Sequence, residues 1–157
     1  MTDSLGAAPY VEALIKEYAE GFAVFLPAVI FLVAAGLAFS TGTSWGTFGV
    51  LLTIVCSVFP SGELMVIAVS ACLAGAVCGD HCSPISDTTI MASTGAQCDH
   101  INHVNTQLGY SMLAAGVSFV GYILAGIIQS AVIVLPICIA LMLVILLFIR
   151  SAQAKKA

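Results

Sequence analysis

The sequence predicts an all-α membrane protein, a polytopic helical bundle that contains a re-entrant hairpin and a discontinuous helix. The chain has 157 residues, of which 61% are hydrophobic and 8% are charged, and its mean hydropathy is +1.12. A soluble domain carries about 25% charged residues, so this composition excludes a soluble enzyme, a nucleic-acid-binding protein and a disordered segment. Between residues 21 and 154, the permanently charged side chains are Glu63, Asp80, Asp87, Asp99 and Arg150.

Residues 1–20 form a polar N-terminal segment. Val11, Leu14, Ile15 and Tyr18 follow the spacing of one helical face, which favours a short amphipathic helix on the membrane surface. A plain connector is the alternative. The segment lacks the basic and apolar regions of a signal peptide, so the later apolar segments must direct membrane insertion.

Residues 21–60 predict the re-entrant hairpin. An apolar run over 21–39 precedes the uncharged, glycine-rich stretch STGTSWGT at 40–47, and a second apolar run covers 48–59. The second run is shorter than the roughly 20 residues that a membrane span requires, and such short runs are often re-entrant or buried. We therefore expect the chain to enter the membrane and return, with STGTSWGT at its tip.

Residues 64–98 predict the discontinuous helix. The segment is too long for one straight helix across a ~30 Å hydrocarbon core, and the polar string DHCSPISD interrupts it. Pro84 removes a backbone donor and disfavours the helical conformation at the residue before it. Ser86 or Asp87 can then cap a new helix. We expect the break to cover residues 79–87.

The rest of the chain predicts a polar loop at 99–106, two spans at 107–129 and 131–149, and a tail at 150–157. Most of the basic residues lie in this tail, which favours a cytoplasmic C-terminus because basic residues are enriched in cytoplasmic segments. The number of crossings then places residues 1–20 outside. The sequence thus predicts a multi-pass protein of the cytoplasmic membrane.

Two polar breaks at membrane depth, together with carboxylates, are typical of an ion-coupled transporter. A broken helix exposes carbonyl oxygens and amides that can hold ions. Burial favours the protonated form of a carboxyl group, so Na⁺ and H⁺ can compete for it. His81 is the candidate for proton handling. The candidate ion-binding or proton-binding residues are Asp80, Asp87, Thr41, Thr43, Ser44, Ser83, Ser86 and Thr88, with the backbone near Gly79.

The acidic residues differ in how well a structural role explains them. Asp87 can serve as a helix cap, alone or in addition to binding an ion. Asp80 lies at the C-terminal end of the first half-helix, where the helix dipole disfavours an anion. An anion at that position in a membrane needs a cation or a proton, which favours a functional role for Asp80. Glu63 and Asp99 are expected to be solvated residues of a turn and a loop.

A zinc site is the alternative interpretation of the cysteines and histidines. Cys78-x-x-His81-Cys82 and Cys98-x-His100-x-x-His103 contain zinc-ligand types. Their spacings match no standard zinc finger, and one cluster would require the 99–106 loop to fold deep into the bundle. We therefore expect no metal apart from transported Na⁺, and no cofactor. Most of the cysteines lie in apolar runs, so we expect no disulfides.

Three segments carry a resemblance to a known family. They are FSTGTSWGTFG at 39–49, GDHCSPISDTTI at 79–90 and CDHINHV at 98–104. Over roughly residues 20–130 the chain resembles the C-terminal part of the NhaC-type Na⁺/H⁺ antiporter family. The resemblance implies a fold with two inverted repeats, of which this chain carries one. It also implies exchange of Na⁺ for H⁺ and, in some members, coupled exchange of carboxylates such as malate and lactate.

Three functions therefore stay open. The first is a non-enzymatic segment of a secondary Na⁺/H⁺ antiporter, and the second is a Na⁺-coupled carboxylate exchanger. The third is an inactive fragment that needs the missing N-terminal repeat. The expected partners are the lipid bilayer, Na⁺, H⁺ and a chain or segment carrying the first repeat, with a homo-oligomer as a further possibility and no nucleic acid.

Overall fold

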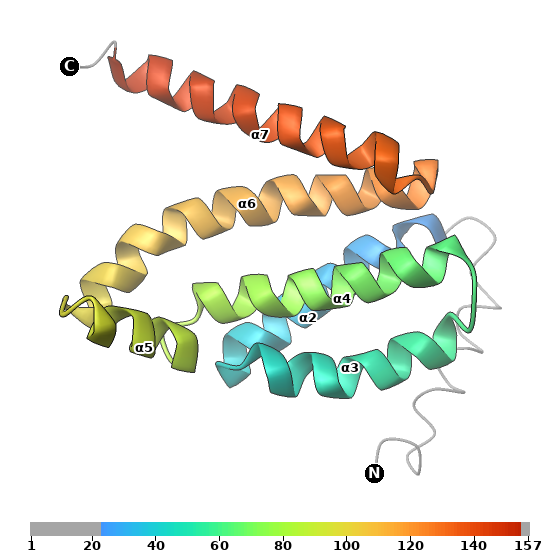
Figure 1. The fold of residues 1–157 in the computed structure, drawn as a ribbon, viewed down its shortest axis with the longest axis horizontal. Coiled ribbons are helices and arrows are strands. Elements are labelled where there is room, and N and C mark those ends of the chain that lie inside the picture. Colours follow the sequence, from blue (N-terminus) through green and yellow to red (C-terminus); the bar gives the residue numbers. More distant parts are fainter. Residues whose placement is uncertain (1–22, 155–157) are drawn as a thin grey trace.

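The computed structural model describes residues 23–154, and this part of the chain is entirely helical apart from short connections (Figure 1). The predicted all-α class is confirmed for these residues, and the expected surface helix within 1–20 lies outside them. A short 3-10 helix, η2 (Ala23–Phe25), is followed by α2 (Leu26–Thr41), α3 (Ser44–Val58), α4 (Glu63–Cys82), α5 (Asp87–Gly95), α6 (His100–Ile128) and α7 (Ala131–Ala154).

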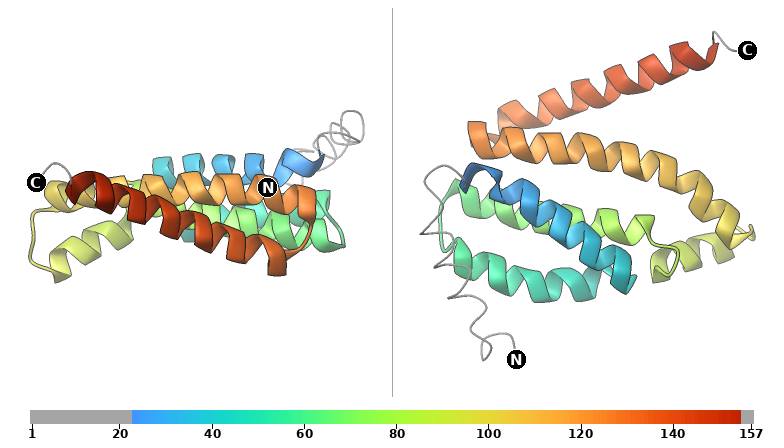
Figure 2. Two further views of the ribbon diagram at one scale, coloured as in Figure 1. Left: turned by 90° about the horizontal axis from the view of Figure 1, so that it is seen from above. Right: turned by 180° about the vertical axis from the view of Figure 1, so that it is seen from behind.

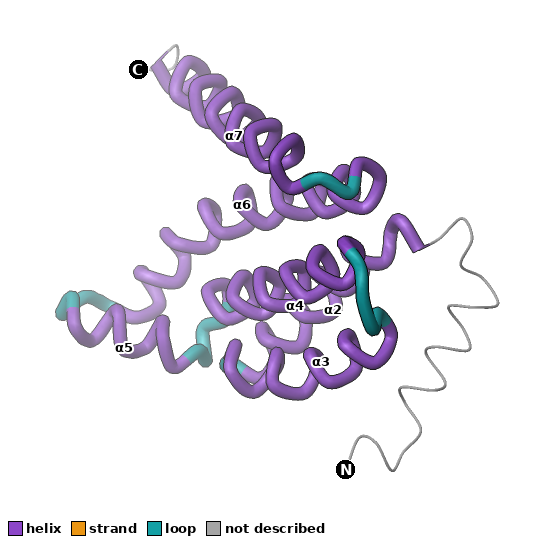
Figure 3. The backbone as a smooth tube through the Cα atoms, turned by 45° about the vertical axis from the view of Figure 1, so that its right-hand side comes forward, coloured by secondary structure: helices purple, strands orange, loops and turns teal. Residues whose placement is uncertain are grey.

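Helices α2, α3 and α4 form the best-packed part of the protein. The hairpin α2–α3 and the returning helix α4 lie side by side, and α2 covers the face of α4 that is turned away from the viewer in Figure 1. The view from behind in Figure 2 brings α2 to the front. Figure 3 shows the connections gathered at two opposite ends of this group. The turn between α2 and α3 and the break between α4 and α5 share one end.

Small residues make the contact between α2 and α4. A Cβ atom at Gly75 would overlap the Phe31 carbonyl oxygen, and one at Gly79 would overlap the Ala35 carbonyl oxygen. In a membrane, close approach of helices through small side chains replaces the hydrophobic driving force as the main source of packing energy. The buried residues of this interface are Ala28, Ala34 and Ala38 on α2 and Ala68, Ala71, Gly75, Ala76 and Gly79 on α4.

The helices α4, α6 and α7 are long and apolar enough to cross a membrane, whereas α2 and α3 are shorter apolar helices. With 29 residues, α6 is about 43 Å long at the usual rise per residue, so it exceeds a ~30 Å hydrocarbon core. Helix α7 packs against the end of α6 and then diverges from it (Figure 1). Its large apolar side chains, such as Val132 and Phe148, are mostly exposed, as expected for a surface that faces lipid or another membrane segment.

The two predicted breaks are shorter in the structure than in the sequence prediction. Only Gly42 and Thr43 lie outside helices at the hairpin tip, so most of STGTSWGT is helical. Gly42 adopts a left-handed backbone (φ 68°), and a Cβ there would lie 2.7 Å from the Ile85 carbonyl oxygen. The second break covers Ser83–Ser86 instead of 79–87, because α4 continues through Gly79, which serves close packing, to Cys82.

The expected polar loop at 99–106 is wrong, since α6 already begins at His100. The Asp99 side chain accepts a hydrogen bond of 2.8 Å from the Asn102 backbone N–H. This bond makes Asp99 a helix N-cap, the role for which aspartate is strongly preferred. The polar residues that follow therefore extend the helix of the predicted 107–129 span by about two turns.

We predict that Gly75→Ala destabilises the protein because its Cβ would meet the Phe31 carbonyl oxygen and lie 2.9 Å from the Ala34 Cβ. Overpacking of this kind typically costs about 1–3 kcal/mol. Gly109→Ala is the matched control, because nothing lies within 4 Å of that Cβ and the gain in helix propensity is the same. Thermal unfolding in detergent should show a lower midpoint for Gly75→Ala only. Equal midpoints would contradict the packing described here.

Candidate functional site

The hairpin tip and the helix break meet at one end of the bundle. The Ser83 hydroxyl donates a 2.7 Å hydrogen bond to the Phe39 carbonyl oxygen, and Ser83 is fully buried. The Asp87 backbone N–H donates to the Gly42 carbonyl oxygen at 3.4 Å. Two polar segments that are far apart in the sequence therefore form one site, as their shared place in Figure 3 also shows.

Asp80 is the buried acidic residue of this site, with 1% of its surface exposed. It lies in the last turn of α4, where the helix dipole disfavours a negative charge. Its Oδ2 accepts a 3.0 Å hydrogen bond from the Thr88 hydroxyl, while its Oδ1 is buried without a hydrogen-bond partner. A buried charge without full compensation is costly, so this carboxylate is suited to binding a cation or a proton.

A chain of hydrogen bonds at the start of α5 is directed at Asp80. The Thr89 backbone N–H donates to the Ser86 hydroxyl at 3.3 Å, and the hydroxyls of Ser86 and Thr88 lie 2.7 Å apart. Thr88 has one hydroxyl proton and gives it to Asp80, so Ser86 must donate its own proton to Thr88. The N-terminal end of α5, which is the favourable end of a helix for an anion, thus partly offsets the unfavourable end of α4.

Ser86, and not Asp87, is the N-cap of α5. Asp87 is the first residue of the helix, its side chain is exposed, and its Oδ1 accepts the Thr88 backbone N–H at 2.8 Å. The cap role considered for Asp87 is therefore wrong. The structure places Asp87 at the edge of the site, whereas Asp80 lies inside it.

The hydroxyls of the hairpin tip form a separate group. Thr41 and Thr47 lie 3.1 Å apart through their hydroxyl oxygens, and Thr47 also donates to the Thr43 carbonyl oxygen at 2.8 Å. Ser44, which follows Thr43 in the chain, is also buried.

Asp80 follows Ala76 by one helical turn, and Ala76 packs against Ala34 and Ala38 of α2. Asp80 therefore lies on the face of α4 that is turned to the hairpin, although its hydrogen bond runs to α5.

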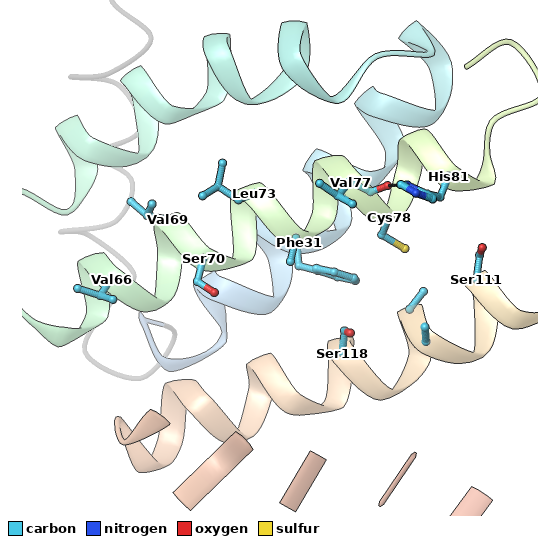
Figure 4. Close-up of a pocket in the computed structure, with 13 residues that line it drawn as sticks. Phe31, Val66, Val69, Ser70, Leu73, Val77, Cys78, His81, Ser111 and Ser118 are labelled. Atoms are coloured by element: carbon cyan, nitrogen blue, oxygen red, sulfur yellow. Dashed lines mark hydrogen bonds between the residues drawn. The ribbon is translucent and has the colours of Figure 1, made fainter. Parts of the chain in front are cut away.

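His81 lies next to Asp80 but on an exposed face of α4, with its Nδ1 2.9 Å from the Val77 carbonyl oxygen. It stands at one end of a groove of about 760 Å³ between α4 and α6 (Figure 4). The groove is lined mainly by apolar side chains such as Val66, Leu73 and Val77. Its three serines provide hydroxyl oxygens, but no carboxylate lines the groove, so a hard cation would find no charged ligand there.

His100 joins the break to α6. Its Nε2 lies 2.7 Å from the Pro84 carbonyl oxygen, and its Nδ1 lies 3.0 Å from the Ser93 hydroxyl. Over residues 23–154 no group of three or more His, Cys, Asp or Glu side chains is placed to hold a metal ion, so the zinc interpretation gains no ligand cluster. The six cysteines are free.

Sequence reasoning missed several polar residues of this end of the bundle. The sequence pattern places Thr47 in the hairpin tip without a role, and it gives no role to Thr89, although this residue follows Thr88. Gln107 was assigned to the start of a plain span. The Thr89 hydroxyl and the Gln107 side-chain oxygen are buried without hydrogen-bond partners. Only the tertiary placement of α5 against α6 reveals them, since neither residue has a distinctive sequence pattern.

The sequence of this chain is similar to those of several known proteins. A profile of the Na⁺/H⁺ antiporter family matches residues 3–127. The chain is 54% identical over 108 residues to an uncharacterised protein of Haemophilus influenzae. This alignment covers 68% of this chain and 21% of the relative. It is 31% identical over 104 residues to a malate-2H⁺/Na⁺-lactate antiporter of Bacillus subtilis. This alignment covers 66% of this chain and 22% of the relative.

A third relative is an uncharacterised Na⁺/H⁺ antiporter of Haemophilus influenzae, 35% identical over 95 residues, with 60% of this chain and 19% of the relative covered. The chain thus spans about a fifth of the length of the curated relatives that it matches. No solved structure shows a significant match.

We predict that Ser83→Ala lowers the free energy of unfolding by about 1–3 kcal/mol, because it removes the buried bond that ties the break to the Phe39 carbonyl oxygen. Ser57→Ala is the control. The Ser57 hydroxyl also donates to a carbonyl oxygen, that of Thr53, but at an exposed position within one helix, so its loss should cost less than about 0.5 kcal/mol. Thermal unfolding in detergent compares the two variants. A larger effect at Ser57 would mean that the Ser83 bond does not hold the two segments together.

Proposed function

Because this chain belongs to the Na⁺/H⁺ antiporter family, we propose that it forms part of a secondary antiporter of the cytoplasmic membrane, with its C-terminus in the cytoplasm. The transported ions are Na⁺ and H⁺, and Asp80 binds them in turn. The observation that carries this proposal is the burial of Asp80 beside a helix break with one carboxylate oxygen unpartnered. The function is transport and not enzymatic catalysis.

Competition for one carboxylate explains why the two ions exchange. In an apolar environment an isolated charge is strongly disfavoured, so the Asp80 carboxylate holds either Na⁺ or H⁺. Na⁺ is a hard cation that binds carboxylate, hydroxyl and carbonyl oxygens. The unpartnered Oδ1 of Asp80 provides the charged ligand, and the hydroxyls of Ser86 and Thr88 and the freed carbonyls of the break are the neutral ligands. Protonation of Asp80 removes the charge that holds Na⁺ and so releases it.

The site needs more protein than this chain. Inverted-repeat transporters bind their ions between two related halves, and this chain spans about a fifth of its curated relatives. We propose that a segment or chain carrying the first repeat covers the exposed residues at this end of the bundle, among them Trp45, Ile85 and Asp87. The bilayer covers the apolar surface of α7.

A second candidate function is Na⁺-coupled exchange of carboxylates. The relative from Bacillus subtilis is named a malate-2H⁺/Na⁺-lactate antiporter, and the N-terminal end of α5 provides the positive helix end that suits an anionic group. The two functions differ in one observable. A carboxylate exchanger moves protons only when a suitable organic acid is present, whereas a Na⁺/H⁺ antiporter needs only the two cations.

We predict that Asp80→Asn abolishes Na⁺-driven proton movement in the complete antiporter while leaving membrane insertion intact. Asparagine keeps the size of the side chain but cannot carry the charge that Na⁺ or H⁺ neutralises. Asp87→Asn is the matched control, because Asp87 is exposed and its side chain bonds to the adjacent amide. It should keep a substantial part of the activity.

Everted membrane vesicles with a fluorescent pH probe provide the measurement, with Na⁺ added in the absence and then in the presence of malate and lactate. Normal Na⁺-driven pH change in Asp80→Asn would remove Asp80 from the ion site. Activity of the unsubstituted protein that depends on the organic acid would support the carboxylate exchanger instead.

A further inference from the structure

A second, smaller pocket lies where the end of α4, the start of α5 and the first turns of α6 meet. Its volume is about 240 Å³. It differs from the groove of Figure 4 in the residue types that line it, because five of its six residues carry a polar side chain. The lining residues are His81, Thr88, Thr89, Ala92, His103 and Gln107.

Two buried polar atoms of this lining have no hydrogen-bond partner within the described chain. They are the Thr89 hydroxyl oxygen, on a residue that is only 3% exposed, and the Gln107 side-chain oxygen. Buried polar groups are almost always hydrogen-bonded to protein or to ordered water. Water in the pocket would supply hydrogen-bond partners for both groups.

The size of the pocket agrees with this. A water molecule occupies about 30 Å³ of liquid volume, and a polar cavity with several hydrogen-bonding groups is hydrated, whereas apolar cavities stay empty. The pocket has room for several water molecules. Its two imidazoles, from His81 and His103, add further hydrogen-bonding groups.

Thr88 links this pocket to the ion site. It lines the pocket, and its hydroxyl donates the 3.0 Å hydrogen bond to Asp80 Oδ2. Asp80 itself is not a lining residue, so Thr88 stands between the two. We propose that the pocket is a hydrated proton path to Asp80, with Thr88 as the relay and with Thr89 and Gln107 holding its water; this inference rests on the proposed function.

The proton step balances without any further reactant. A protonated water in the pocket breaks one O–H bond and passes that proton to the Thr88 hydroxyl oxygen. At the same time the original hydroxyl proton of Thr88 moves along its hydrogen bond to Asp80 Oδ2. The products are a neutral water, a regenerated threonine hydroxyl and a neutral carboxylic acid, which no longer holds Na⁺. The reverse sequence returns the proton when Na⁺ binds.

The same lining argues against the pocket being the Na⁺ site. It contains no carboxylate, so no lining residue neutralises the charge of a cation. Its nitrogen ligands suit softer metals better than hard cations. The pocket is therefore better suited to conducting protons than to holding the exchanged cation.

Removing the two unpartnered polar groups tests the path. In the complete antiporter, Thr89→Val and Gln107→Leu keep the approximate size of each side chain. We expect the rate of Na⁺-driven proton movement to fall about tenfold or more. This is less than the roughly 10²–10⁴-fold loss typical of a removed proton-transfer group, because these two side chains hold the water and do not transfer the proton. The KM for Na⁺ should stay within about twofold, because the Thr89 hydroxyl and the Gln107 side-chain oxygen make no hydrogen bond to the proposed Na⁺ ligands. Thr94→Val is the control, since that hydroxyl bonds to the Ile90 carbonyl oxygen on the same helix and does not line the pocket.

A second measurement does not depend on how well these variants fold. On a background without native cysteines, Ala92→Cys and Met91→Cys are treated with a charged, water-soluble thiol reagent. Both residues lie on α5 and both are exposed, but only Ala92 lines the pocket. We expect reagent attached at position 92 to stop proton movement, and reagent at position 91 to leave it unchanged.

The outcomes separate this inference from the proposed function. If the unsubstituted protein shows no Na⁺-driven proton movement, the proposed function is wrong. If it transports and neither the pocket variants nor reagent at position 92 slow it, the proton path is wrong while the antiport stands. A rise of about fivefold or more in the KM for Na⁺, with an unchanged maximal rate, would also overturn the path, because the pocket would then bind Na⁺.

Discussion

The break between α4 and α5 dictates how the rest of this end of the protein is built. Interrupting a helix in an apolar surrounding leaves backbone groups without partners, and each such group costs several kcal/mol in hydrocarbon. The surrounding elements supply these partners. The Gly42 carbonyl oxygen accepts the Asp87 N–H, and His100 bonds to the Pro84 carbonyl oxygen. The hairpin tip and the first turn of α6 therefore supply hydrogen-bond partners for backbone groups in the break, Ser83–Ser86, and directly after it at Asp87.

The same contacts explain why small residues matter along α4. The Ser83 hydroxyl reaches the Phe39 carbonyl oxygen at the end of a contact in which α2 and α4 approach each other closely at Gly75 and Gly79. That approach depends on Gly75 and Gly79, where any side chain would meet the backbone of α2. Packing in the middle of the bundle thus sets the geometry at its polar end. The buried Asp80 is placed by both, since it follows Gly79 directly and precedes the break.

The sequence predicted the features that depend on local chemistry. Pro84 forced Ser83 into an extended conformation, and a serine or aspartate after it capped the next helix, as local rules require. The rest depends on tertiary contacts that no local pattern contains. Gly79 was interpreted as the start of the break, but its role is close packing against Ala35. Asp87 was a reasonable cap, but Ser86 takes that role.

The same reasoning applies to the candidate site. Asp80 was identifiable because an acidic residue at the C-terminal end of a membrane helix needs compensation. The motif contains several hydroxyl groups that could donate a hydrogen bond to Asp80, and in the structure the donor is Thr88. The sequence does not predict a place for Gln107 in the site, because only the packing of α5 beside α6 brings this side chain next to Thr88 and Thr89 at one pocket.

The hydrogen bond between Thr88 and Asp80 also connects the charge of Asp80 to the arrangement of the helices. It joins the last turn of α4 to the first turn of α5. Hydrogen bonds to an ionised group are stronger than those between neutral groups, so the state of the Asp80 carboxylate changes the strength of the contact that holds the start of α5. Helix α5 has only nine residues, and hydrogen bonds between Thr88 and Asp80 and between Ser93 and His100 join it to α4 and α6. The attachment of this short helix to α4 therefore depends on the charge of the Asp80 carboxylate.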